Sequence, residues 1–328
     1  MFRWIRWCTI ACALLGMPLL AQAQGNYPNR PIKFVIAFPP GGATDTFFRL
    51  ISNELGTALG QSIVIENKGG AGGYIAWQAV AASPADGYTV LVAENAIGIN
   101  QALFKHHPSG FNPLRDYDAV GAMASTPLVW TVANNVPADN FADFVKWSKT
   151  VPGHFNYGSA GPGSVSHLVP EVILDGAGIQ AVHVPFKGGG PAAQAVAGGF
   201  VAVVTSSLPV AKAQVEGKLV KAMFVTSPKR AATLPNVPGL SELGYKFADV
   251  DLEFWWGLFV PKGTPEPIRA KLEKALQDAM ANPAVRARLT KVDTDPSFAP
   301  GPALRAKLER EITNWSKFID AKGIKVQQ

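Results

Sequence analysis

Apolar and polar positions along this chain form blocks that predict strands followed by helices. Residues 32–38 are almost wholly apolar, as expected of a strand buried on both faces. From Phe47 to Leu55 the apolar positions then recur at helical spacing. The next strand, helix and strand are predicted at residues 62–67, 74–82 and 88–94. Strands that alternate with helices indicate βαβ units and a parallel sheet.

The same alternation starts again near residue 127 and continues to the end of the chain. Further strands are predicted at residues 127–134, 155–160, 181–186, 200–207 and 218–227. Helices are predicted between them at residues 140–150, 164–177, 191–197 and 209–216. Three helical segments close the chain, starting near residues 264, 282 and 302.

This order of elements predicts an α/β protein of two lobes. Extended crossings are expected around residues 123–132 and 250–260, with the C-terminal helices returning to the first lobe. The first lobe then comprises residues 24–126 and 249–328, and the second comprises residues 127–248. Because ligands of such sheets bind beyond the carboxyl ends of the strands, the facing strand ends should form one cleft.

The first 23 residues have the pattern of a signal peptide. Arg3 and Arg6 precede an apolar run at residues 8–20, and Ala21-Gln22-Ala23 matches a small-x-small cleavage site. The run is too short to span a bilayer, which requires about 20 apolar residues. There is no Arg-Arg pair, so we expect Sec-type export to the periplasm. Lipoprotein processing at Cys12 is an alternative, but the leading Leu that it requires is missing.

Composition then excludes several kinds of site. Cys8 and Cys12 are the only cysteines, and both lie in the predicted signal peptide, so the mature chain has no disulfide, thiolate zinc site or cysteine nucleophile. Removing Arg3 and Arg6 lowers the formal net charge from +6 to +4, too small an excess to indicate nucleic-acid binding. With 48% apolar and 16% charged residues, the chain is typical of a well-packed globular protein.

Glycine-rich turns follow several of the predicted strands. "AFPPGGATDTFFRL" runs from a strand through Gly41 and Gly42 into a helix start, where backbone N–H groups and the helix dipole can bind an anion. It is not a P-loop, because no GK[ST] follows. Alternatively, the glycines only allow a sharp turn, and Thr44 or Asp45 caps the helix. Three more such turns are "KGGAGG", "YGSAGPGSVSHL" and "FKGGGP".

Catalytic and metal-binding patterns are weak. No G-x-S-x-G nucleophile elbow is present, and Ser159 and His167 lie at opposite ends of one loop–helix unit. The histidines include no H-x-x-x-H pair, and the adjacent His106 and His107 point apart on any regular element. We therefore expect no enzyme activity, no metal and no cofactor.

Seven stretches of the chain resemble one known family. They are "YPNRPIKFVIAFPPGGATDTFFR", "IVIENKGGAGGYIA", "ADGYTVLVA", "FNYGSAGPGSVSHL", "HVPFKGGGPA", "VTSPKRAATLPNVPGLSELGY" and "WWGLFVPKGTPEPI". In order and spacing the chain resembles the periplasmic solute-binding proteins of tripartite tricarboxylate transporters, the Bug or TctC type. The resemblance implies a type II periplasmic-binding-protein fold with a ligand cleft between two lobes. It also implies a monomer that passes a small carboxylate to integral-membrane transporter subunits. A sensor that reports ligand occupancy to a signalling partner is the alternative.

The resemblance also implies which residues hold the ligand. Backbone amides and ordered water from loops of both lobes would bind its carboxylate through charge-assisted hydrogen bonds. The first lobe would contribute Phe38, Gly41, Gly42, Thr44 and Asp45. The second would contribute Ser159, Ser164, Lys187, Gly188, Ser206 and Ser207, with Lys187 either adding a point charge or facing solvent.

Departures from the family pattern narrow the expected ligand. Gln194, Ala202 and Ser206 are neutral where family members often have an acid, and Glu216 is the only acid within residues 182–227. We therefore expect a mono- or dicarboxylate without an amine. An aromatic dicarboxylate such as terephthalate becomes an alternative to an aliphatic or hydroxy-carboxylate if Phe38 and one tryptophan face the cleft. The other candidate aromatic residues are Tyr74, Trp77, Trp130, Phe186, Trp255 and Trp256.

Overall fold

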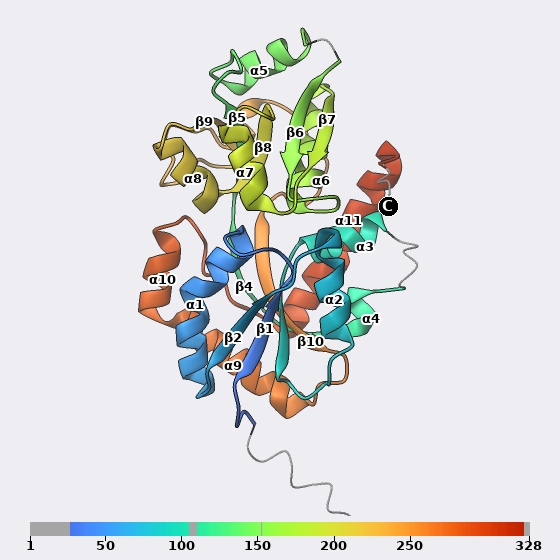
Figure 1. The fold of residues 1–328 in the computed structure, drawn as a ribbon, viewed down its shortest axis with the longest axis vertical. Coiled ribbons are helices and arrows are strands. Elements are labelled where there is room, and N and C mark those ends of the chain that lie inside the picture. Colours follow the sequence, from blue (N-terminus) through green and yellow to red (C-terminus); the bar gives the residue numbers. More distant parts are fainter. Residues whose placement is uncertain (1–26, 105–109, 152, 325–328) are drawn as a thin grey trace, which may run out of the picture.

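The computed structural model describes residues 27–104, 110–151 and 153–324. Two β-sheets lie in separate halves of the molecule, each accompanied by helices (Figure 1). This two-lobed α/β arrangement confirms the fold class expected from the sequence. The predicted signal peptide and His106–His107 lie outside the described residues. Among the described helices, none is both long and apolar enough to cross a bilayer.

The first sheet has six strands in the order β11-β4-β10-β3-β1-β2. β1 pairs in parallel with β2 and β3, whereas β10 runs antiparallel to both of its neighbours, β3 and β4. The strands are β1 (Ile32–Ile36), β2 (Ile63–Asn67), β3 (Thr89–Glu94), β4 (Tyr117–Thr126), β10 (Phe254–Pro261) and β11 (Ala299–Pro300).

Helices cover both faces of the first sheet (Figure 1). On one side, α1 (Ala43–Leu59) contacts α9 (Glu266–Ala281) and α10 (Pro283–Thr290). On the other, α11 (Gly301–Lys322) contacts α3 (Ala96–Leu103) and β4. The sequence did not predict α3. The remaining short helices of this half are η1 (Ala71–Gly73), α2 (Tyr74–Ala81) and α4 (Pro113–Asp116).

The second sheet has five strands in the order β7-β6-β8-β5-β9. The strands are β5 (Leu128–Ala133), β6 (Phe155–Ser159), β7 (Ala181–Pro185), β8 (Val203–Ser207) and β9 (Val220–Val225). The helices are α5 (Phe141–Ser148), α6 (Val165–Ala177), α7 (Gly189–Ala197), α8 (Leu208–Glu216) and η2 (Leu240–Leu243). Each of these lies within about three residues of its predicted position where one was predicted.

The parallel pairing expected from the βαβ pattern is present between β1 and its neighbours β2 and β3, and between β6 and its neighbours β7 and β8. The antiparallel pairing of β5 and β10 was not predicted, and it arises because the chain crosses between the sheets. Pro127 joins β4 in the first sheet directly to β5 in the second, and residues 226–253 lead from β9 to β10. When the chain passes from one half of the molecule to the other, the strand that it then forms begins at the interface between the two halves and runs away from it. β5 and β10 are these strands, and they pair antiparallel with β8 and β3, respectively, which end there.

β10 is the centre of the first hydrophobic core, and all eight of its residues are buried. Side chains alternate between the two faces of a strand. Trp256 stacks on Phe47 of α1 with 4.1 Å between ring centroids, whereas the indole of Trp255 donates a hydrogen bond to Glu311 of α11 at 2.5 Å. The two adjacent tryptophans therefore fix helices on opposite faces of the sheet.

Leu258 of β10 is fully buried, and we expect Leu258→Ala to lower the free energy of unfolding by about 2–5 kcal/mol, through lost burial and the cavity left behind. Leu219→Ala is the matched control, because Leu219 is 50% exposed, and its effect should stay within about 0.5 kcal/mol. Urea unfolding followed by tryptophan fluorescence measures both. An equal loss of unfolding free energy in the two variants would contradict the position of β10 in the core.

Candidate functional site

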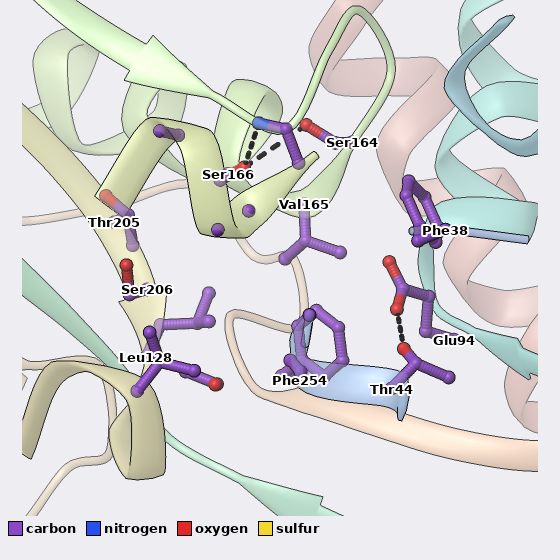
Figure 2. Close-up of a pocket in the computed structure, with 18 of the residues that line it drawn as sticks. Phe38, Thr44, Glu94, Leu128, Ser164, Val165, Ser166, Thr205, Ser206 and Phe254 are labelled. Carbon is purple, nitrogen blue, oxygen red and sulfur yellow. Dashed lines mark hydrogen bonds between the residues drawn. The ribbon is translucent and has the colours of Figure 1, made fainter. Parts of the chain in front are cut away.

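A cavity lies between the two sheets, at the ends of strands from both (Figure 2). It has about 70 Å³ of space open to the centre of a water molecule. A single water needs about 10–15 Å³ by this measure, so the cavity has room for a ligand of several heavy atoms. Its lining comprises Phe38, Gly41, Gly42, Ala43, Thr44, Glu94, Leu128, Ala160, Ser164, Val165, Ser166, Gly189, Gly190, Ala192, Val204, Thr205, Ser206, Ser207, Val210 and Phe254.

Four helices begin at this cavity: α1, α6, α7 and α8. Their N-cap residues are Gly42, Ser164, Gly188 and Ser207, and within the described residues no side chain caps the first amides of these helices. Asparagine side chains cap α4, α5 and α10, whereas α2, α3 and α9 also lack a side-chain cap but contribute no residue to the cavity lining. What distinguishes α1, α6, α7 and α8 is that their starts converge on one cavity. Uncapped helix starts present N–H groups and the positive end of the helix dipole. At α8 the first two positions offer no free N–H, because the Leu208 amide donates to the Pro127 carbonyl at 3.0 Å and Pro209 has none. The cavity is therefore suited to an anion.

The glycine turn before α1 is held by Asp45. Gly41 has a φ of 79°, and its amide donates to Asp45 Oδ2 at 3.0 Å. Arg49 forms an ion pair with the same carboxylate at 2.9 Å. Burial alone would raise the pKa of Asp45, but its hydrogen bonds with Arg49 and Gly41 lower the pKa below the usual value. Asp45 is therefore an ionised group that shapes the turn, and it lies outside the cavity lining.

Glu94, the last residue of β3, lines the cavity and is 6% exposed. One of its carboxyl oxygens accepts a hydrogen bond from Thr44 Oγ1, which in turn accepts one from Trp256 Nε1 at 3.1 Å. Burial raises the pKa of Glu94 to about 8, and the hydrogen bond from Thr44 opposes this shift. Our sequence-based argument considered only acids within residues 182–227 and missed Glu94. Its place at a strand end was the available signal.

The second lobe contributes hydroxyl groups from the end of β8. Thr205 Oγ1 and Ser207 Oγ are buried and have no hydrogen-bond partner in the part of the chain that the structure describes. Ser206, between them, is 9% exposed and also lines the cavity. Buried polar atoms nearly always have a partner, so the two unpaired hydroxyls indicate that a ligand or water completes this wall.

The structure brings most of the predicted site residues together. Those that line the cavity are Phe38, Gly41, Gly42, Thr44, Ser164, Ser206 and Ser207. Ser159 is fully buried, and its Oγ accepts from the Gly161 amide at 3.0 Å, so it supports the loop before α6. Lys187 and Gly188 line a second cavity of about 600 Å³, which shares Phe38 and Ala160 with the first.

Among the candidate aromatic residues, Phe38 lines the first cavity and Phe186 lines the second. No tryptophan is among the lining residues described, because Trp77, Trp130, Trp255 and Trp256 are buried in the cores. Phe254, which we did not single out, supplies a second ring in the first cavity (Figure 2). The described residues also include no group of three His, Cys, Asp or Glu side chains able to hold a metal ion.

A group of buried and partly buried aromatic and polar side chains lies behind the cavity wall in the second lobe. The rings of His167 and His183 stack with 4.0 Å between centroids, and His183 Nε2 lies 2.6 Å from Ser159 Oγ. His167 Nδ1 accepts from the Gly163 amide at 3.2 Å. His167, considered above as a base for Ser159, therefore binds backbone instead. Burial lowers the pKa of His167 to about 3 and that of His183 to about 4, so both rings are neutral at pH 7.

The two lobes touch beside the cavity. Asn100 of α3, in the first lobe, donates through Nδ2 to the carbonyl oxygen of Gly163, in the second lobe, at 2.7 Å. Gly163 has a φ of 76°, and a Cβ added there would lie 2.5 Å from Asn100 Oδ1. A Cβ on Gly72 would likewise lie 2.5 Å from the carbonyl oxygen of Pro162. Glycine is therefore required on both sides of this contact.

Comparison with known proteins identifies the family. The model of the Tripartite tricarboxylate transporter family receptor, TctC, matches residues 47–324. The chain belongs to the TctC family. This confirms the resemblance seen in the sequence.

Solved structures of similar sequence have the same fold. The periplasmic binding protein BugD is 30% identical, with a TM-score of 0.85 over 92% of this chain and 100% of that one. MatC from Rhodopseudomonas palustris, solved with bound malate, is 31% identical, with a TM-score of 0.81 over 89% and 100%. An R. palustris protein solved with adipate is 29% identical, with a TM-score of 0.86 over 92% and 99%. BugD is a periplasmic binding protein, and the TctC family is one of transporter receptors and not of enzymes.

The neutral His167 ring leads to a testable pH dependence. In the unfolded chain His167 binds a proton near pH 6.5, whereas in the folded protein it does so only near pH 3. Its contribution to stability is therefore complete above pH 6.5 and is lost as the pH falls below that value, by about 1.4 kcal/mol per pH unit. His167→Gln should reduce this slope in urea unfolding between pH 7 and pH 4.

The exposed His154 provides the control, since His154→Gln removes a histidine that is accessible in both folded and unfolded states. Its pH slope should equal that of the wild type. An unchanged slope in His167→Gln would show that the buried His167 ring does not govern acid stability.

Proposed function

We propose that this TctC protein is exported to the periplasm, captures a small carboxylate between its lobes and delivers it to the membrane subunits of a tripartite tricarboxylate-type transporter. The observation that carries the proposal is the convergence of four uncapped helix starts on one cavity. Helix starts of this kind bind anions through backbone N–H groups. In this proposal residues 24–126 and 249–328 form one lobe, and residues 127–248 form the other.

Each lobe supplies a different part of the proposed ligand site. The amides at the start of α1, after Gly41 and Gly42, and those at the start of α7 would donate to the ligand carboxylate. The unpaired hydroxyls of Thr205 and Ser207 would complete its hydrogen bonds from the second lobe. Asp45 and Ser159 act as positioning residues, because each holds a ligand-facing loop in shape rather than lining the cavity.

We propose a ligand without an amine. The neighbours solved with malate and adipate hold dicarboxylates of this class, and the cavity wall formed by the second lobe contains no acid in the described residues. Phe38 and Phe254 also present two rings to the ligand, which keeps an aromatic carboxylate within the proposal. Lys187 lines the adjoining cavity and would pair with the far carboxylate of a longer ligand.

Thermal unfolding with a panel of carboxylates tests the proposal directly. Succinate, malate, adipate, citrate, benzoate and terephthalate would be compared with aspartate and glutamate. A ligand at 100 times its dissociation constant stabilises the folded state by about 2.7 kcal/mol, which raises the melting temperature by a few degrees. We expect a shift with at least one amine-free carboxylate and none with the amino acids. No shift with any carboxylate would overturn the proposed function.

The unpaired hydroxyl of Thr205 permits a matched pair of variants. Thr205→Val removes a buried hydroxyl without a partner, so it should leave the unfolding free energy unchanged or higher while raising Kd for the ligand about tenfold. Thr131→Val, on the neighbouring strand, removes a hydroxyl that donates to the Val204 carbonyl at 2.6 Å. It should lower stability by about 1 kcal/mol and leave Kd unchanged. Titration calorimetry and urea unfolding separate the two outcomes.

A further inference from the structure

Glu94 is the one ionisable group in the cavity lining that the structure describes; the other polar side chains there are hydroxyls. The elements packed around it offer no counter-charge. From α1, Thr44 faces Glu94, and from β10 the neighbours are Trp256 and Phe254. The nearby Asp45 carboxylate is bound to the Gly41 amide and to Arg49 instead. An acid at the centre of an anion-binding cavity requires an explanation.

The hydrogen bonds around Glu94 set the direction in which it can donate. An indole N–H only donates, so Trp256 Nε1 makes Thr44 Oγ1 an acceptor at 3.1 Å. The Thr44 proton is then directed to Glu94 Oε2. Because Oε2 accepts the Thr44 proton in this arrangement, Oε1 is the oxygen available to carry the proton of a neutral Glu94. Figure 2 shows this second oxygen turned away from Thr44, on the side of Phe38, in the cavity.

We infer that Glu94 binds the ligand as a neutral carboxylic acid, donating its Oε1 proton to an oxygen of the ligand carboxylate, so that carboxylate affinity depends on pH. The inference rests on the function proposed above. It gives this site a side-chain donor in addition to the backbone amides, and it makes the bound complex an acid–carboxylate pair that shares one proton.

Electrostatics supports a shared proton. Two ionised carboxylates in contact repel each other strongly where water is excluded, so one of them keeps its proton. The desolvated position of Glu94 already favours the neutral form before any ligand arrives, with a pKa of about 8. A bound carboxylate would favour it further. Above this pKa, binding must be accompanied by uptake of one proton.

The experiment is calorimetric titration of malate and adipate into the mature protein between pH 6.5 and pH 9. The carboxyl groups of both ligands titrate well below this range, so their charge is constant. We expect Kd to rise about tenfold from pH 6.5 to pH 9, with proton uptake revealed by heats that vary with the ionisation enthalpy of the buffer. Glu94→Gln, which keeps an N–H donor at every pH, should bind with a flat profile.

Glu311→Gln is the matched control. Glu311 is a second buried acid of raised pKa, owing to desolvation, but it lies on α11 against Trp255 and outside the cavity lining. This variant should retain the pH profile of the wild type. If Glu311→Gln also removes the pH dependence of Kd, that dependence arises from the stability of the fold and not from the ligand site.

Two further outcomes separate this inference from the proposed function. Binding of malate or adipate with a flat pH profile in the wild type overturns the role of Glu94 and leaves carboxylate capture standing. Absence of binding by either ligand, and by the rest of the carboxylate panel, overturns the proposed function itself. Tighter binding of aspartate than malate in the wild type, reversed in Glu94→Gln, shows an ionised Glu94 that accepts from an ammonium group and also overturns the inference.

Discussion

Trp256 lies at the junction between the first hydrophobic core and the site, and its single N–H donor ties them together. The ring stacks on Phe47 in the core, while Nε1 donates to Thr44 at the start of α1. Thr44 in turn binds Glu94 at the end of β3. The central strand, the glycine turn and the buried acid are thus held in one relative position. Trp256 Nε1 can only donate, and the two recorded hydrogen bonds run in the same direction, from Trp256 to Thr44 and from Thr44 to Glu94.

Strand direction explains why so many helix starts meet in one place. β1, β6, β7 and β8 all end at the interface between the sheets, and each is followed by a helix that begins there. The returning strands β5 and β10 carry the chain away from the interface, so they occupy central positions without adding a helix start to it. The concentration of free amides is therefore a consequence of topology and does not require a single basic residue in the cavity lining.

Patterns local in sequence predicted much of this architecture. Apolar runs such as residues 32–38, and the helical spacing from Phe47 to Leu55, located strands and helices because burial imposes a periodicity. Strand ends also indicated the loops that line the cavity. By contrast, strand direction after a crossing is a property of the whole chain, so the antiparallel pairing of β5 and β10 was missed. Glu94 was missed because its significance depends on desolvation and on Trp256, 162 residues away.

Asn100 has a consequence for the rate at which ligand exchanges. Its side chain binds the Gly163 carbonyl across the interface, and the close approach of Gly72 to Pro162 adds a second point of contact. In the proposed complex, a ligand covered by both lobes would leave only after these contacts separate. Its residence time would then depend on the opening of the protein as well as on the ligand's own hydrogen bonds, and ligands of different affinity would share one upper limit on their dissociation rate.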